Sequence, residues 1–296
     1  MRSKRLAAFV AGLVVLPACG PRPVEEQAKL PEYQAFGRAE RVAIRGYDGD
    51  AMEPFVTKDG RYLLFNNRND PRIDTNLHFA RRIDALTYQY GGALKGANTP
   101  ALEGVPSVDR AGNLFFVSTR SYKETLSTLY RGSFVDGTVS DVRLVGGVSR
   151  RQPGIVMFDA EIASDGNTLF VVEGEFSGGP HPRSADIAIA VRDGTEFRRV
   201  ASSAELLKHV NTAALEYAPA VSSDLLELFF TRASGTGPPA IFRTVRRSAA
   251  EPFETPQKVG AISGFVEAPA LSGDGRSLYY HKLEGGRFLI YRVSRP

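Results

Sequence analysis

Acidic side chains recur at one place in this chain, shortly before a repeated proline or its substitute. The five acids are Glu53, Glu103, Asp159, Glu216 and Glu267. If the strands that follow line a channel, these carboxylates surround one mouth of it. Such a ring could bind a hard cation, which needs six to eight oxygen ligands, or the basic groups of a partner. Two of the acids, separated by roughly 5–9.5 Å, could instead hydrolyse a glycosidic bond. The structural alternative is that each acid caps loop amides or pairs with an arginine of an adjacent unit.

A second polar set follows the apolar cluster of each unit, where a strand is expected to end. Its candidate binding residues are Arg68, Arg120, Arg232 and His281. Polar variety at one repeated position is typical of a binding surface. It is equally typical of strand ends that are simply exposed.

Other catalytic patterns are missing from the sequence. The four histidines lie in different units without metal-ligand spacing, and we predict no metal site among them: His78, His181, His209 and His281. There is no HExxH motif, no Gly-rich phosphate loop and no Gly-x-Ser-x-Gly elbow. Tryptophan, a common platform for sugars, is absent, although tyrosine could replace it. No cofactor is expected, apart from a cation at the acidic mouth.

The acids are positioned by a repeat that returns five times. Each copy has proline or a substitute, then a turn residue six positions later, then an apolar cluster, as in Pro54 to Gly60 and Pro269 to Gly275. The turn positions 60, 112, 166, 225 and 275 are 52, 54, 59 and 50 residues apart. Asp-Gly is a strong signal for a tight hairpin because glycine readily adopts positive φ. Leu225 stands where glycine is expected, so we predict that the fourth turn differs in type.

Each interval has room for two further strands, as in 287–293 of the last copy, and four antiparallel strands form a propeller blade. The sequence therefore predicts an all-β propeller of five four-stranded blades, with six blades as the alternative. The strand-like segment 39–44 precedes the first copy. We expect it to complete the last blade and close the ring, since an open edge strand invites aggregation.

The phrase Pro-x-x-Ser-x-Asp-Gly-x-x-Leu-Phe-Phe resembles the TolB-type propeller repeat of periplasmic and outer-membrane-associated bacterial proteins. The likeness is best at 218–232 and 268–282 and good at 53–67. It implies the fold, and a role as a scaffold in envelope complexes. Some members are fused to peptidases, and TolB itself has an additional N-terminal domain. This chain shows neither part, so neither peptidase activity nor binding to Pal is expected.

The N-terminus has the features of a bacterial lipoprotein signal peptide. Arg2, Lys4 and Arg5 form a basic region, and 6–16 form an apolar stretch too short to span a bilayer. Leu-Pro-Ala-Cys then ends at Cys19, the only cysteine, which looks like the acylated residue of a lipobox. We therefore expect a signal peptide at 1–18, a lipidated tether at 19–37 and one propeller domain at 38–296. By resemblance to other lipoproteins, Gly20 indicates the outer membrane, with the domain facing the periplasm.

Removing residues 1–18 takes away three positive charges, so the formal net charge of +4 becomes +1. This balance gives no reason to expect nucleic-acid binding. A single cysteine also excludes a disulfide framework.

Taken together, these features favour a non-catalytic, membrane-anchored binding module or protein-interaction scaffold of the bacterial cell envelope. Its expected partners are membrane lipid, through acylated Cys19, and an envelope protein or peptide; the chain is expected to be a monomer. The alternative is a glycoside-active enzyme that uses the acids at the channel mouth.

Overall fold

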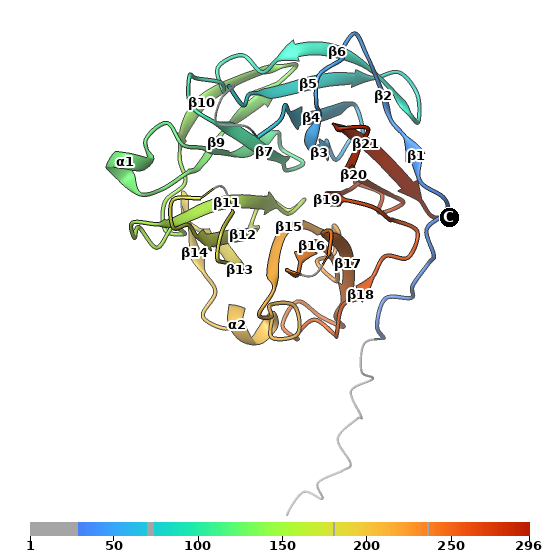
Figure 1. The fold of residues 1–296 in the computed structure, drawn as a ribbon. Coiled ribbons are helices and arrows are strands. Elements are labelled where there is room, and N and C mark those ends of the chain that lie inside the picture. The colour runs from blue at the N-terminus through green and yellow to red at the C-terminus, as the bar shows by residue number, and fades with distance from the viewer. Residues whose placement is uncertain (1–28, 70–73, 180, 236) are drawn as a thin grey trace, which may run out of the picture.

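The protein forms a ring of twisted sheets around a centre (Figure 1). The computed structural model describes residues 29–69, 74–179, 181–235 and 237–296. Within these residues the strands form four sheets, one of which joins two antiparallel groups through a single parallel pair, Ala185 with Leu215. We therefore describe five antiparallel groups and number them in chain order. The all-β propeller fold predicted from the repeats is therefore confirmed. Cys19 and the predicted signal peptide lie outside the described residues.

The first two groups contain four consecutive antiparallel strands each. Group 1 consists of β3 (Met52–Val56), β4 (Tyr62–Asn66), β5 (Leu77–Arg82) and β6 (Thr87–Ala93). Group 2 consists of β7 (Glu103–Val108), β8 (Asn113–Ser118), β9 (Leu129–Val135) and β10 (Thr138–Leu144). The short helix α1 (Tyr122–Thr125) connects β8 to β9.

Groups 3 and 4 follow the same plan. Group 3 consists of β11 (Ile155–Ile162), β12 (Thr168–Glu175), β13 (Ser184–Asp193) and β14 (Glu196–Arg199). Group 4 consists of β15 (Leu215–Val221), β16 (Glu227–Ala233), β17 (Ala240–Val245) and β18 (Gln257–Lys258). The short helix α2 (Ser203–Leu206) lies between them in the chain.

Group 5 shows how the ring closes. It contains β19 (Val266–Leu271), β20 (Ser277–Glu284) and β21 (Arg287–Ser294), and β1 (Glu40–Arg41) adds to β21 as its fourth strand. The predicted closing segment 39–44 does not stay with group 5, however. After Val42, β2 (Ala43–Arg45) pairs in parallel with β6 of group 1. The segment therefore joins the first and last groups, because buried Val42 packs into the core between them.

The second strand of each group explains the apolar clusters of the sequence. In β4, Leu63 and Phe65 face the core shared with group 5, whereas Leu64 faces the core shared with group 2. Successive side chains of a strand point to opposite faces, so a strand buried on both faces reads as a continuous apolar run. Five such cores lie between neighbouring groups, including the one between groups 5 and 1. Each buried Phe or Leu contributes roughly 1.5–3 kcal/mol.

The fourth turn does not differ in type, contrary to the prediction. Leu225 has φ +64°, close to the +72° of Gly60 and +73° of Gly275. Its N–H donates to the carbonyl of Ser222 at 3.0 Å, as the N–H of Gly275 does to Ser272 at 2.9 Å. The left-handed conformation costs a non-glycine residue about 1–2 kcal/mol. Leu225 tolerates it because its side chain packs against the core between groups 3 and 4.

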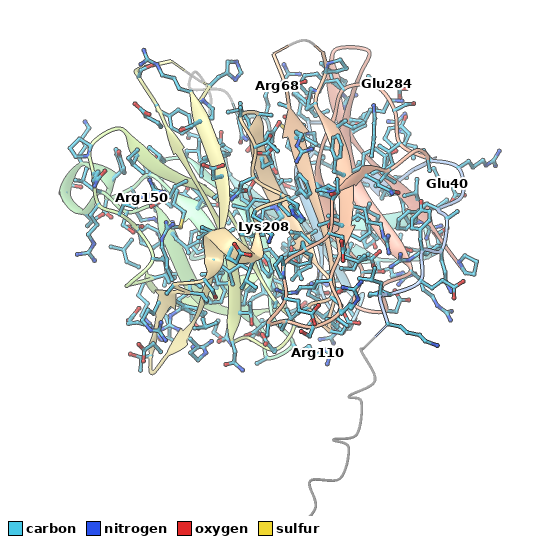
Figure 2. All side chains as sticks on the ribbon, turned by 90° about the horizontal axis from the view of Figure 1, so that it is seen from below. Glu40, Arg68, Arg110, Arg150, Lys208 and Glu284 are labelled. Carbon is cyan, nitrogen blue, oxygen red and sulfur yellow. The ribbon has the colours of Figure 1, made fainter. Side chains whose placement is uncertain are left out.

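The first strand of each group lines the centre of the ring and defines its two faces. We call the face on which these strands begin the mouth face, and the face with their hairpin turns the turn face. Arg68 and Glu284 lie on the mouth face and Arg110 lies on the opposite, turn face (Figure 2). No helix in the described part of the chain is long and apolar enough to cross a membrane.

Candidate functional site

A bulge shapes the start of the strands that line the channel. The residue before the repeat proline has positive φ in four groups: Glu53 (+49°), Val105 (+56°), Ala218 (+50°) and Ala268 (+55°). Its N–H donates to a polar atom of the preceding group, as Val105 does to Asn66 Oδ1 at 3.0 Å and Ala268 does to Thr231 Oγ1 at 3.0 Å. Bulges re-aim side chains, and here they also connect neighbouring groups.

Two of the five predicted acids make internal structural contacts and do not face the channel. Glu103 and Glu216 are fully buried. Glu216 accepts hydrogen bonds from the N–H of Thr212 at 3.0 Å, from its hydroxyl at 2.7 Å, and from Arg232 Nε at 2.6 Å. Glu103 accepts the same pair of bonds from Thr99, at 2.8 and 2.7 Å. We call these two arrangements the carboxylate cages, and they correspond to the structural alternative of capped loop amides.

Two of the predicted strand-end residues are the cations of these cages. Arg120 pairs with Glu103 at 3.2 Å, and Arg232 pairs with Glu216 at 2.6 Å, each within its own group. Each guanidinium also lies over an aromatic ring, 4.8 Å from Tyr130 and Phe242 respectively. The third arginine, Arg68, binds Asp50 at 2.8 Å and the carbonyl of Gly286 at 2.7 Å, which ties group 1 to group 5. The two sets drawn from the sequence are thus largely one set of internal contacts.

The remaining three acids come from groups 1, 3 and 5 and lie within electrostatic reach of one another: Glu53, Asp159 and Glu267. We call them the channel acids. They differ from the cage acids in position, since Glu103 and Glu216 stand three residues before the proline, Glu267 two, and Glu53 one. Asp159 likewise precedes Ala160, which stands in the proline position. Side chains alternate between faces, so a shift of one residue separates Glu267 from the cage acids. Glu53 and Asp159 are shifted by two residues, and a bulge in each of their strands changes the direction of the side chains.

Glu53 and Asp159 line a cavity of about 20 Å³ at the centre of the ring, together with Glu161 and the repeat prolines. A volume of this size holds about one water molecule. Glu161, which lines the cavity, forms a buried ion pair with Lys58 at 3.3 Å. The cavity is therefore a shallow acidic site for one small group, and it is too small for a sugar ring.

His281 connects two of the channel acids. Its Nδ1 accepts a hydrogen bond from the N–H of Glu53 at 3.1 Å, so Nε2 carries the proton and donates to Glu267 at 3.2 Å. The Tyr217 hydroxyl donates to the other carboxylate oxygen of Glu267. Of the predicted strand-end residues, His281 is therefore the one that lies in the channel cluster. Tyr217 was missed, although it stands two residues before Pro219 as Glu267 does before Pro269.

The environment divides the channel acids into two protonation states. Burial raises the pKa of Asp159 to about 8. Hydrogen bonds from the backbone N–H groups of Ala218 and Ala160 act against this shift, and the charges of Glu161 and Glu267 add to it. Burial and the charges of Asp159 and Glu267 likewise raise the pKa of Glu53. Burial acts in the same direction on Glu267, but the hydrogen bonds from His281 and Tyr217 outweigh it and lower the pKa of that carboxyl. At neutral pH Asp159 thus keeps its proton while Glu267 is a carboxylate, and Glu53 is shifted in the same direction as Asp159.

Aromatic rings that were not predicted as site residues surround the cluster of channel acids, His281 and Tyr217. The ring of Phe158 lies 6.2 Å from Tyr217 and 5.8 Å from Phe176. On the other side, Phe288 lies 5.3 Å from His281 and 6.3 Å from Phe265, which is 36% exposed. Aromatic faces attract cations, so these rings suit the same kind of ligand as the carboxylates.

No group of three His, Cys, Asp or Glu side chains in residues 29–69, 74–179, 181–235 and 237–296 is arranged to hold a metal ion. His78 is instead enclosed by Tyr47, Phe65 and Tyr90, and burial lowers its pKa to about 4.

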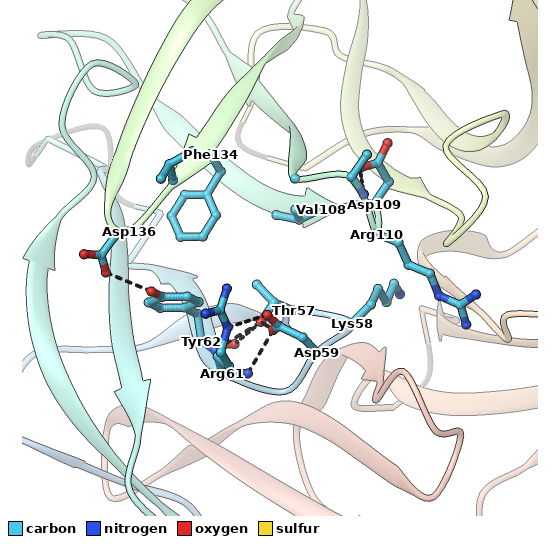
Figure 3. Close-up of a pocket in the computed structure, with 13 residues that line it drawn as sticks. Thr57, Lys58, Asp59, Arg61, Tyr62, Val108, Asp109, Arg110, Phe134 and Asp136 are labelled. Atoms are coloured by element: carbon cyan, nitrogen blue, oxygen red, sulfur yellow. Dashed lines mark hydrogen bonds and ion pairs between the residues drawn. The ribbon is translucent and has the colours of Figure 1, made fainter.

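The turn face carries a larger groove, of about 750 Å³, between groups 1 and 2 (Figure 3). Its aromatic wall is formed by Tyr62 and Phe134, whose ring centroids lie 5.3 Å apart. Several of its charged groups are neutralised locally. Asp59 pairs with Arg61 at 2.5 Å, and the Tyr62 hydroxyl donates to Asp136 at 2.8 Å. None of the sequence-predicted site residues lines this groove.

Comparisons with known proteins identify the fold class. The chain matches no protein-family model and no curated protein. Among solved structures, it is similar to the catalytic domain of a GH62 α-L-arabinofuranosidase from Coprinopsis cinerea, with 10% identity and a TM-score of 0.56 over 88% of this chain and 97% of that one. It is also similar to a family 117 glycoside hydrolase from Zobellia galactanivorans, with 11% identity and a TM-score of 0.54 over 88% and 90%.

TolB from Acinetobacter baumannii matches with 15% identity and a TM-score of 0.45 over 83% of this chain, which spans 54% of the TolB chain. At such identities the likenesses concern the fold alone. The protein is thus an all-β propeller protein whose structural neighbours include TolB proteins and glycoside hydrolases.

Proposed function

We propose that this protein is a non-catalytic binding module of the bacterial cell envelope, anchored to lipid through Cys19, whose channel mouth receives a basic group from a protein or peptide partner. The single observation that supports the binding role is that Glu53 and Asp159, from groups 1 and 3, line one small cavity, while Glu267 of group 5 is close enough to act on both electrostatically.

The fold does not require acids at these positions. At the bulge before the proline, groups 2, 4 and 5 carry Val105, Ala218 and Ala268 in place of Glu53. Burying carboxyl groups beside one another opposes folding, since each must hold a proton or accept an uncompensated charge. A strongly perturbed group in a concave site is therefore a candidate for function rather than for stability.

A lysine ammonium of the partner suits this cavity better than a sugar does. The ammonium is a compact point charge with three donors, and the cavity of about 20 Å³ takes one group of that size. A cation there favours the ionised forms of Asp159 and Glu53, so binding releases protons. We expect the affinity to rise with pH up to about 8, the pKa of free Asp159.

The location is proposed from the sequence. The basic, apolar and Leu-Pro-Ala-Cys segments of the N-terminus support export and acylation, and Gly20 supports the outer membrane with the domain facing the periplasm. The protein would act there as a monomer that holds its partner near the membrane.

Glycoside hydrolysis is the second candidate, favoured by the opposite pKa shifts of Asp159 and Glu267. A protonated acid beside a carboxylate is the arrangement that such enzymes use. One of the solved structures to which the chain is similar is a glycoside hydrolase, with a TM-score of 0.58. Two observations argue against this candidate. The cavity is too small for a sugar ring. In addition, both carboxylate oxygens of Glu267 already accept hydrogen bonds, one from Tyr217 and one from His281.

Affinity capture from the native envelope separates the two candidates. We expect wild-type protein to retain a partner in stoichiometric amount and the Glu53→Gln/Asp159→Asn variant to lose it. Glu284→Gln is the matched control, because Glu284 is an exposed acid on the same face and should retain the partner. Equal capture by all three proteins would contradict the proposed site. Hydrolysis of envelope glycans that Glu267→Gln abolishes would favour the enzyme instead.

A further inference from the structure

The N-terminal segment of the described chain is fixed to one face of the disc. The guanidinium of Arg243 lies 4.7 Å from the centre of the Tyr33 ring, and that of Arg295 lies 5.0 Å from the Phe36 ring. Phe36 is 7% exposed and packs edge-on against Phe229, with ring centroids 5.9 Å apart. The N–H of Gly37 donates to the carbonyl of Ser294 at 2.8 Å. Residues 33–37 are thus held by groups 4 and 5.

That segment lies on the turn face. Pro31, Glu32 and Gln34 line one cavity of about 430 Å³ together with the hairpin turns Ser222–Asp224 and Gly273–Arg276. These are the turns that end the first strands of groups 4 and 5, opposite the end at which Glu267 lies. The two arginines are themselves fixed, since Glu227 binds Arg295 at 2.6 Å and also pairs with Arg243. The chain therefore leaves the disc on the side of Arg110, away from Arg68 and Glu284 (Figure 2).

The connection to the lipid is short compared with the disc. Ten peptide units separate Cys19 from Lys29 (29 − 19 = 10). Ten residues span at most about 33–36 Å when fully extended. A strand of eight residues such as β11 is about 26 Å long. Bringing the mouth face to the lipid would need a nearly fully extended tether that runs the whole height of the disc.

We infer that the anchored protein sits with its turn face towards the lipid and its mouth face towards the aqueous compartment, so that the channel acids meet a partner that is not in the same membrane surface. This inference rests on the proposed lipid anchor at Cys19. It specifies which face of the disc is available, and it places the groove between groups 1 and 2 on the membrane side.

Energy transfer to labelled lipid tests the orientation. The full-length protein, purified from an acylating host, is placed in vesicles of phosphatidylethanolamine and phosphatidylglycerol with a headgroup-attached acceptor dye. A donor dye is coupled to Arg110→Cys on the turn face or to Glu284→Cys on the mouth face. Cys19 is the only native cysteine, and acylation blocks its thiol, so each introduced cysteine would be the one free thiol. We expect at least twofold more efficient transfer from position 110 than from position 284.

Equal transfer from the two positions, or more transfer from position 284, would overturn the orientation. In Tyr33→Ala, which weakens the fixed segment, the two efficiencies should approach each other. The anchor is tested separately by treating wild-type protein with the same thiol-reactive dye. Labelling of the wild type, or loss of vesicle binding, would show a free Cys19 and would contradict the proposed function itself rather than the choice of face.

Discussion

Two kinds of buried acid occupy neighbouring positions on the strands that line the channel. A positively charged arginine lies beside each acid of the first kind, whereas other carboxyl groups lie beside each acid of the second kind. The cage acids, Glu103 and Glu216, receive hydrogen bonds from a threonine and an arginine of their own group. The channel acids face one another across group boundaries, and burial raises the pKa of Glu53 and Asp159. The comparison teaches that an acid in a repeat supports the fold when donors surround it, and opposes the fold when other acids do.

The largest expected effect comes from opening a cage. In Glu216→Ala, Arg232 loses its partner while 18% exposed, and the Thr212 N–H loses its acceptor. Removing one partner of a buried ion pair costs about 3–5 kcal/mol. We expect a loss of that size in the free energy of unfolding, measured by urea titration. A loss below about 1 kcal/mol would remove the distinction between the two kinds of acid.

A smaller effect is expected at Glu267, the channel acid that accepts hydrogen bonds from two side chains, Tyr217 and His281. In Glu267→Gln, the hydrogen bond from His281 Nε2 loses its charged acceptor, while the relief of repulsion on Asp159 offsets part of the loss. We expect a net loss of about 1–2 kcal/mol at pH 7. Because the folded pKa of Glu267 is lowered, its contribution is present above the unfolded pKa and lost as pH falls through the folded value. The difference from wild type should therefore shrink below about pH 4, which urea titrations at pH 7 and pH 3.5 would test.

The smallest effect concerns one bond of a cage. Thr212→Ala removes the hydroxyl that donates to Glu216 at 2.7 Å but keeps the backbone donor and Arg232. A single hydrogen bond to a charged group contributes about 1.5–3 kcal/mol. Because the remaining donors still bind Glu216, we expect the free energy of unfolding to fall by only about 1 kcal/mol. Thr99→Ala in the other cage should behave alike. A difference of several kcal/mol between the two variants would mean that the cages are not equivalent.

Much of the fold follows from local patterns in the sequence. The apolar runs 63–65, 169–171 and 278–280 identify strands that are buried on both faces, and the Asp-Gly turns at 59–60, 165–166 and 274–275 fix the hairpins before them. Leu225 was misjudged because a turn rule ignores packing, and here core contacts hold a leucine at positive φ. The path of 39–45 was only half predicted, since parallel pairing with β6 depends on a neighbour far along the chain.

The site was harder to predict than the fold. The sequence names five acids at one repeated place, and the structure separates them into two kinds by a shift of one or two residues combined with a bulge. Which residues a bulged strand turns towards the channel depends on backbone geometry that alternation alone does not give. The partners of the cages, Thr99 and Thr212, stand four residues before their acids. That Thr-x-x-x-Glu spacing is a signal in the sequence that could have distinguished the cage acids.

The most direct test of the account is the free energy of unfolding of Asp159→Asn and wild type between pH 4 and pH 9. A carboxyl whose folded pKa of about 8 exceeds its unfolded value of about 3.9 binds more protons in the folded state, so it makes the protein less stable as pH rises between the two values. We expect Asp159→Asn to be more stable than wild type by on the order of 5 kcal/mol at pH 8, with the difference disappearing near pH 4. If Asp159→Asn were instead less stable at pH 8, Asp159 would be a structural acid like Glu216, and the distinction on which the binding site rests would be wrong.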